Sequence, residues 1–258
     1  MPVREDILMK NILKATISFI ALGVLSVGLA AQTTSTRDDG DTQTRVTQQL
    51  AKKNDFRNVQ AATEDGIVTL SGNVDLYEQK LDAAKKVRKL DRVQGVRNLV
   101  AVSSSAPDAE VEAKLDRKLH YDRIGYDNQF NFVDASVKNG VATLIGETRT
   151  DVGRDSALAI ANYMPGVKDV VDSIKVSPVS GFDDRIRISA LRVIYRDPVL
   201  GRYASDPAKP IRIVVDNGKL SLYGTVATAM DKQIAGIRAN QVFGVFSVQN
   251  NLEVVKGS

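Results

Sequence analysis

The sequence predicts an α+β protein of three tandem α-β-β-α-β modules, each a three-stranded mixed sheet with two helices on one face. Two observations lead to this prediction. First, the segment DGIVTLSGNV at 65–74 returns as NGVATLIGET at 139–148 and as NGKLSLYGTV at 217–226. Second, a valine lies 21 residues after the later glycine of each copy and begins the pattern V-x-x-V-x-[N/D]-x-[V/I/L]-x-V. Matching spacing in three copies indicates an internal repeat.

The repeated glycines predict a tight hairpin in each module. An Asp-Gly or Asn-Gly pair suits a type I′ turn, in which both central residues need a positive φ. The strand after the turn alternates apolar and polar residues, as at Val68 and Leu70. The later glycine is expected to end this strand where the chain turns toward a helix. The structural glycines are Gly66, Gly72, Gly140, Gly146, Gly218 and Gly224.

Apolar residues at helical spacing predict two helices in each module. The helix after the hairpin has inward positions at Ala83, Val87 and Leu90, at Ala157, Ala161 and Met164, and at Ala235, Ala239 and Val242. The opening helix ahead of the hairpin is marked by Val46 and Leu50, by Val111, Leu115 and Leu119, and by Ile186, Ala190 and Ile194. The valine-rich motif that follows the second helix is expected to form the third strand.

The N-terminal residues 1–31 are expected to be a secretory signal peptide. Lys10 and Lys14 precede an apolar run, and Gly28 and Ala30 suit the two small positions of a cleavage after Ala30. A retained membrane anchor is the alternative, because the run is about as short as a spanning helix can be. A complete signal-like start begins at Met9, so the natural start is either Met1 or Met9.

The remaining chain divides into a leader and three modules. Residues 32–41 are polar and are expected to form a flexible leader. The modules are expected at 42–104, 108–178 and 183–255, and linkers of about five residues between them suggest an articulated string. The loop before the hairpin is long in the second and third modules, and variable loops on a repeated scaffold tend to carry specificity.

The composition excludes several kinds of chemistry. The 258 residues include no Cys and one His, His120, which removes thiolate sites and most histidine-based catalytic or metal sites. P-loop, GxGxxG, HExxH and GxSxG motifs are absent from the sequence. The acidic pair Asp183 and Asp184 is expected to provide a helix N-cap rather than a metal ligand. We therefore expect no catalytic residues, no metal and no cofactor.

The charge distribution identifies candidate binding residues. Residues 42–104 carry a net charge of +4, residues 108–178 carry −3, and residues 183–258 carry +4. A basic, amphipathic helix in the first module is a candidate contact with a lipid surface, as are cations beside Tyr203 in the third. A solvated helix face is the alternative interpretation. The candidates are Lys80, Lys85, Lys86, Arg88, Lys89 and Arg92, and then Arg202, Lys209 and Arg212.

The order of helix, strand, [DN]-G-x-[VAL]-[TS]-L-x-G hairpin, helix and valine-rich strand resembles the BON domain. The three copies cover about residues 42–255, and the architecture is similar to that of OsmY-like periplasmic proteins, which usually have two copies. The resemblance implies a non-catalytic periplasmic protein that binds anionic phospholipid or other envelope components and supports envelope integrity or stress responses. A chaperone-like or protein- or glycan-binding module without lipid affinity is the alternative, and nucleic acid is not an expected partner.

Overall fold

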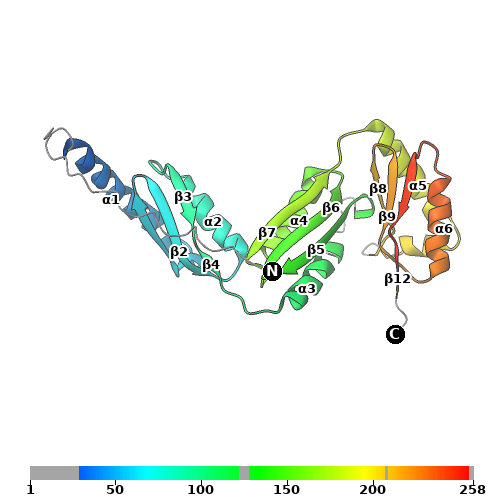
Figure 1. Cartoon of the computed structure of the whole chain (residues 1–258), viewed down its shortest axis with the longest axis horizontal. Coiled ribbons are helices and arrows are strands. Elements are labelled where there is room, and N and C mark those ends of the chain that lie inside the picture. The colour runs from blue at the N-terminus through cyan, green and yellow to red at the C-terminus, as the bar shows by residue number, and fades with distance from the viewer. Residues whose placement is uncertain (1–28, 122–127, 207–208, 256–258) are drawn as a thin grey trace, which may run out of the picture.

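The computed structural model describes residues 29–121, 128–206 and 209–255, which form three modules in a row (Figure 1). Each module has a mixed sheet with helices packed against it, and the third module has a further two-stranded parallel pair, so the predicted fold class is confirmed. In the first module the elements are α1 (Leu29–Ala51), β1 (Val59–Glu64), β2 (Ile67–Val74), α2 (Tyr77–Arg88), β3 (Gly95–Asn98) and β4 (Ala101–Val102).

The second and third modules repeat this order. The second contains α3 (Asp108–Tyr121), a short 3-10 helix η2 (Asn128–Phe130), β5 (Phe132–Lys138), β6 (Val141–Thr148), α4 (Asp151–Asn162) and β7 (Asp169–Val176). The third contains α5 (Gly181–Tyr195), η3 (Leu200–Ala204), β8 (Arg212–Asp216), β9 (Lys219–Tyr223), β10 (Thr225–Val226), α6 (Ala229–Asn240), β11 (Ser247–Asn250) and β12 (Glu253–Val254). A further 3-10 turn, η1 (Asn54–Phe56), follows α1.

The second hairpin strand is the centre of each sheet. In the second module β6 pairs antiparallel with β5 and parallel with β7, which returns after α4. The last strand is continuous in this module, but in the other two it is divided, into β3 and β4 and into β11 and β12. At the division, Asn98 accepts a hydrogen bond from the backbone N–H of Val100, and Asn250 accepts one from Leu252.

The predicted apolar stripes form the cores. Val46 and Leu50 of α1 are buried with Ala83 and Val87 of α2 against the first sheet, and the corresponding residues of the other modules are buried in the same way. Leu90 lies only partly buried at the edge of the first core. Burial of a helix stripe against the sheet is what the 3.6-residue period requires.

The expected flexible leader is wrong, because α1 begins at Leu29 and runs through residues 32–41. The polar residues of this part of α1 contact the hairpin of the first module, which the composition of the segment does not indicate. The carboxylate of Asp39 accepts the backbone N–H groups of Asp65 at 2.8 Å and Gly66 at 2.9 Å, and Thr42 is buried. The predicted signal peptide falls mostly on residues 1–28, which lie outside the described residues.

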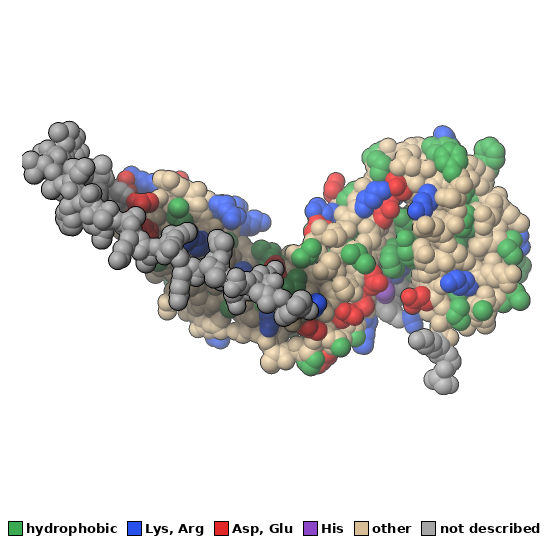
Figure 2. All heavy atoms as spheres, viewed as in Figure 1, with side chains coloured by type: hydrophobic (Ala, Val, Ile, Leu, Met, Phe, Trp, Pro, Cys, Tyr) green, Lys and Arg blue, Asp and Glu red, His purple; other side chains and the backbone are tan. Residues whose placement is uncertain are grey.

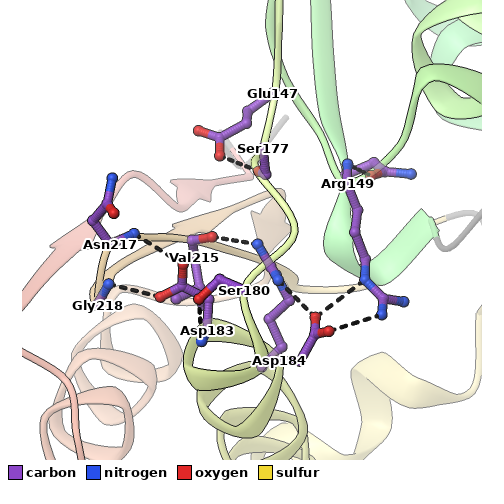
Figure 3. Close-up of polar contacts among 11 residues, drawn as sticks. Glu147, Arg149, Ser177, Ser180, Asp183, Asp184, Val215, Asn217 and Gly218 are labelled. Carbon is purple, nitrogen blue, oxygen red and sulfur yellow. Dashed lines mark hydrogen bonds and ion pairs between the residues drawn. The ribbon is translucent and has the colours of Figure 1, made fainter.

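The same carboxylate clamp recurs in the other modules. Asp108 accepts the N–H of Asn139 at 2.6 Å and that of Gly140 at 2.9 Å. Asp183 accepts the N–H of Asn217 at 3.1 Å and that of Gly218 at 2.8 Å (Figure 3). These N–H groups point out of the turn, and an acceptor on the opening helix satisfies them.

The expectation that Asp183 or Asp184 caps a helix is therefore wrong. The N-cap of α5 is Ser180, whose hydroxyl accepts the Asp183 N–H at 3.2 Å. Asp183 points instead to the hairpin, and Asp184 bonds to Arg149 and Arg187. A capping residue must precede the first helical turn, whereas both aspartates lie within it.

Two of the later glycines lie inside strands rather than at their ends. Gly72 in β2 and Gly146 in β6 have φ values of 103° and 129°. A Cβ at Gly72 would lie 2.0 Å from the carbonyl oxygen of Asn58, and one at Gly146 would lie 2.1 Å from that of Phe132. Glycine is needed here because the neighbouring backbone crosses too closely for a side chain.

The 3-10 helix η2 of the second module packs against the third module. Phe130 in η2 belongs to the core cluster of the third module. Arg212 of β8 is 3% exposed, and its guanidinium donates to the side-chain oxygen of Asn128 at 2.6 Å. The rings of Phe132 and Tyr223 stack with their centroids 4.1 Å apart. The two modules therefore share a packed joint, which an articulated string does not have.

The opposite edge of this joint is polar. Arg149 follows β6 and forms an ion pair with Asp184 of α5 at 3.3 Å (Figure 3). Burial by itself would raise the pKa of Asp184, but hydrogen bonds from Arg187 and Arg149 hold that pKa below its usual value. Lys175 of β7 forms a further ion pair with Asp216 of β8. Both pairs connect the second module to the third.

The first module touches the second through Tyr77 at the start of α2. Tyr77 packs against the core clusters of both modules. Burial and a hydrogen bond with Asp169 raise the pKa of its hydroxyl to about 12. This contact is narrower than the joint between the second and third modules, since it places no residue of one module inside the core of the other.

Candidate functional site

The exposed end of α2 is the strongest charged surface among the predicted site residues. Lys85, Arg88 and Lys89 are exposed at helical spacing in the last turn and at the C-cap. We call these three residues the basic end of α2. Figure 2 shows Lys and Arg side chains on the upper side of the first module, in the region of this helix. The α-helix dipole favours cations at this terminus, so the positions suit charged side chains.

The other three predicted cations of the first module have partners or packing roles. Lys86 forms an ion pair with Asp82 at 3.7 Å, and Arg92 forms one with Asp38. Lys80 is partly buried, and its backbone carbonyl accepts a hydrogen bond from the Asn98 side chain at 2.8 Å. A partnered cation has less attraction left for an external anion. Of the six cations predicted in the first module, the three at the basic end of α2 are therefore the strongest candidates for contact with an external anion.

The third-module cations do not form the predicted exposed group. Arg202 is exposed but forms an ion pair with Asp231 at 2.9 Å and lies over the ring of Tyr203. Arg212 is buried in the joint between modules, so its prediction as a lipid contact is wrong. Arg212 lies between Ile211 and Ile213 at the start of β8, and this strand packs against η2 of the second module, a contact between modules that the sequence pattern does not show.

A hydrogen bond from Tyr203 and nearby positive charge stabilise the ionised form of Asp231. The Tyr203 hydroxyl donates to this carboxylate and accepts the N–H of Ala227 at 2.7 Å. The hydrogen bond from Tyr203 and those from Thr228, together with the charge of Arg202, hold the pKa of Asp231 below its usual value against the effect of burial. Tyr203 and Arg202 thus fasten η3 to the start of α6.

A cleft of about 480 Å³ lies at the joint between the second and third modules. It is lined by His120, Phe132, Arg202, Tyr203, Lys209 and Arg212, among others. The guanidinium of Arg212 bonds to Asn128 and to the carbonyl of His120, and that of Arg202 bonds to Asp231. Because these cations are engaged within the protein, the cleft is better explained as the edge of a structural joint than as an anion site.

An exposed aromatic surface was not predicted from the sequence. Phe243 is 94% exposed and Phe246 is 77% exposed, both in the connection between α6 and β11. Phe182 in the first turn of α5 is 38% exposed and stacks on Phe246 at a centroid distance of 5.7 Å. We call these three residues the aromatic tip. Alignment of the three repeats could have identified it, because the other two modules carry different residues at these positions.

One carboxyl group, that of Asp116, has a strongly raised pKa. Burial and the charges of Asp134 and Glu112 raise the pKa of Asp116 in α3 to about 7, and Asp116 shares a hydrogen bond with Asp134 in β5. Across the described ranges, no group of three or more His, Asp or Glu side chains is arranged to hold a metal ion. In the same ranges no helix has the length and apolar character needed to cross a membrane.

Comparison with known families matches most of the chain to one family. The family model described as BON domain matches residues 38–104, 107–178 and 199–256. The third match begins after α5, although α5 supplies the opening helix and the hairpin clamp of that module. No curated protein matches the sequence.

Solved structures give only a distant likeness. CdsD, a structural protein of the Type III secretion system of Chlamydia trachomatis, is 15% identical, with 86% of this chain and 94% of that chain covered and a TM-score of 0.25. The periplasmic domain of the inner membrane protein PrgH from S. typhimurium is 11% identical, with 81% and 99% covered and a TM-score of 0.21. Likeness at these scores supports no conclusion about this chain.

Proposed function

The chain belongs to the BON-domain family of non-catalytic, envelope-associated modules, and from this premise we propose that it is an exported protein that docks on anionic phospholipid through the basic end of α2. The observation that carries the proposal is the exposure of Lys85, Arg88 and Lys89 on one helical face, while the neighbouring cations Lys86 and Arg92 form ion pairs within the module. Docking of this kind would support envelope integrity or an osmotic or stress response.

The size of the charge effect favours reversible docking. A Lys or Arg close to an anionic membrane surface contributes about 1 kcal/mol, so three cations give a binding energy of roughly 3 kcal/mol. Exposed charges are screened over about 8 Å at physiological ionic strength. The attraction should therefore be strong at low salt and weaken as salt is added.

The experiment is co-sedimentation of the chain, purified after export, with anionic and with zwitterionic vesicles at two salt concentrations. The test variant is Lys85→Glu/Arg88→Glu/Lys89→Glu. The control is Arg117→Glu/Lys138→Glu/Arg196→Glu, which changes the net charge equally at exposed positions on other elements. We expect the test variant to lose roughly a hundredfold in partitioning at low salt, and the control to lose much less.

Either of two results would overturn the proposal. Equal losses in the test and control variants would mean that net charge alone, rather than α2, determines binding. Absence of pelleting with any vesicle would favour the chaperone-like or protein- or glycan-binding alternative, for which crosslinking in the envelope would identify the partner.

A further inference from the structure

The three modules place different side chains at one and the same backbone position. The N–H of Gln94 donates to the carbonyl of Gly66, that of Lys168 to Gly140, and that of Phe246 to Gly218, each at 2.8 Å. Glutamine, lysine and phenylalanine therefore serve the same backbone role. The fold itself therefore does not require an aromatic residue at Phe246. The Phe246 side chain is also largely exposed, so it does not fill the core.

Neighbouring positions at this end of the module also change from polar residues in the first module to apolar ones in the third. In the first module Asp38, which precedes the clamping aspartate, forms an ion pair with Arg92. In the third module Phe182 precedes the clamping aspartate, and its ring lies 3.5 Å from where a Cβ of Gly244 would be. A polar pair in one copy is thus replaced by an apolar ring against a glycine in the other.

The surroundings of the aromatic tip are basic. Arg185 lies three residues after Phe182 on α5 and is exposed, and Lys219 is exposed directly after the hairpin turn. The three nearby acids are engaged, Asp183 by the hairpin N–H groups, Asp184 by arginines and Asp216 by Lys175. Apolar rings with cations nearby match the boundary between the acyl chains and the headgroups of an anionic bilayer.

The small area of the tip argues against a protein partner. A stable protein interface buries about 800 Å² on each partner, whereas an aromatic side chain buries at most about 150–250 Å². Phe182 is already partly buried, so the tip offers mainly the rings of Phe243 and Phe246. A lipid surface needs no complementary pocket and accepts a small protruding apolar group. Figure 2 shows hydrophobic side chains at the upper end of the third module.

We propose that the aromatic tip inserts into the headgroup–acyl boundary of an anionic bilayer and provides a second, hydrophobic anchor. The inference rests on the proposed lipid docking, which by itself requires only the basic end of α2. A charged anchor on the first module and an apolar anchor on the third would hold the protein along the membrane. Charge attraction fades with salt, whereas ring insertion does not.

The test uses tryptophan as a reporter, since the chain contains no Trp. Phe243→Trp places the reporter in the tip, and Gln94→Trp places it at the corresponding end of the first module as the control. Both variants are mixed with anionic vesicles whose acyl chains carry bromine, which quenches Trp fluorescence on contact. We expect a blue shift and quenching for Phe243→Trp, and neither for Gln94→Trp.

A second variant separates the tip from the docking surface. Phe243→Asp/Phe246→Gln introduces the residues that the first module carries at these positions, so the backbone is compatible with them. We expect this variant to lose roughly tenfold or more in partitioning at physiological salt, with unchanged thermal unfolding.

The outcomes distinguish the two proposals. Unshifted, unquenched Phe243→Trp on vesicles that still sediment the protein would overturn tip insertion while lipid docking stands. Loss of binding in the tip variant but not in the α2 variant would support insertion and overturn docking through α2. Quenching of both reporters to the same extent would mean general adsorption and would also overturn tip insertion.

Discussion

Asp183 and Gly218 connect the opening helix of the third module to its hairpin, with the carboxylate oxygen 2.8 Å from the backbone nitrogen. Asp39 and Asp108 make the same connection in the other two modules. The clamp joins residues that are 26 to 35 positions apart. It therefore joins parts of the module that are far apart in the sequence, and it also satisfies the turn.

Removal of this clamp is expected to destabilise the module that contains it. Asp183→Ala leaves two turn N–H groups without their acceptor, one of them buried, so the free energy of unfolding should fall by about 1–3 kcal/mol. Denaturant unfolding followed by circular dichroism measures the loss. Asp91→Ala, which removes an exposed carboxylate, is the control, and an equal loss there would contradict the role of the clamp.

The two strand glycines should tolerate no side chain. Gly146→Ala forces a Cβ to within 2.1 Å of the Phe132 carbonyl oxygen at a φ of 129°, and the strands must separate to relieve this contact. We expect a loss of about 2–4 kcal/mol, as for other severe overpacking and backbone strain. Thermal unfolding is the measurement.

Gly40→Ala is the matched control for this substitution. Gly40 lies in α1 with no atom within 4 Å of its Cβ position. Alanine should therefore stabilise the helix by about 0.5–1 kcal/mol. A Gly146→Ala protein as stable as the Gly40→Ala protein would show that the close backbone approach is unimportant.

Arg212 should couple the unfolding of the second and third modules. Arg212→Leu removes the donor to Asn128 and leaves that buried amide oxygen without this partner, at a cost of about 1–3 kcal/mol. We expect the two modules to unfold in one transition in the unmodified chain and in two transitions in the variant, which differential scanning calorimetry distinguishes. Arg196→Leu, at an exposed arginine, should leave the transitions together.

The carboxyl pair in the second module predicts an unusual pH dependence. The pKa of Asp116 is about 7 when folded, against an ordinary value of 3.8, so the folded state holds a proton that the unfolded state releases. Its contribution to stability is therefore present at low pH and is lost as the pH rises through about 7. The melting temperature should be higher at pH 5 than at pH 8.

Asp116→Asn tests the source of this effect, because asparagine keeps the shape of the side chain and does not titrate. The difference in melting temperature between pH 5 and pH 8 should shrink in this variant. Carboxylates whose pKa is held low, such as Asp197 and Asp231, lose their contribution only at still lower pH and do not act in this window. An unchanged pH slope in Asp116→Asn would refute the assignment.

The repeats and the core could be predicted because their causes are local. Apolar side chains recur every two residues on the buried face of a strand and every 3.6 residues on that of a helix. The burial of Val68 and Leu70, and of Ala157 and Ala161, could therefore be predicted from the local pattern alone. The hairpin turns were equally readable, because an Asn-Gly or Asp-Gly pair meets the positive φ that the turn requires.

The site was less predictable because exposure and pairing depend on distant contacts. Lys85 and Lys86 are adjacent in sequence, yet one is exposed and the other lies beside Asp82. A count of charges along the chain treats them as equal. The exposed rings of Phe243 and Phe246 were missed because apolar residues near a core motif ordinarily suggest burial.

By itself, the sequence determined the module, its threefold repetition and the residues that fill each core, because period and turn chemistry act over a few residues. Only the tertiary structure decided that α1 continues through the polar leader, that Asp183 holds a hairpin, and that Arg212 is buried between two modules. Each of these depends on contacts between residues that are far apart in the sequence, and no local pattern in the chain specifies those contacts.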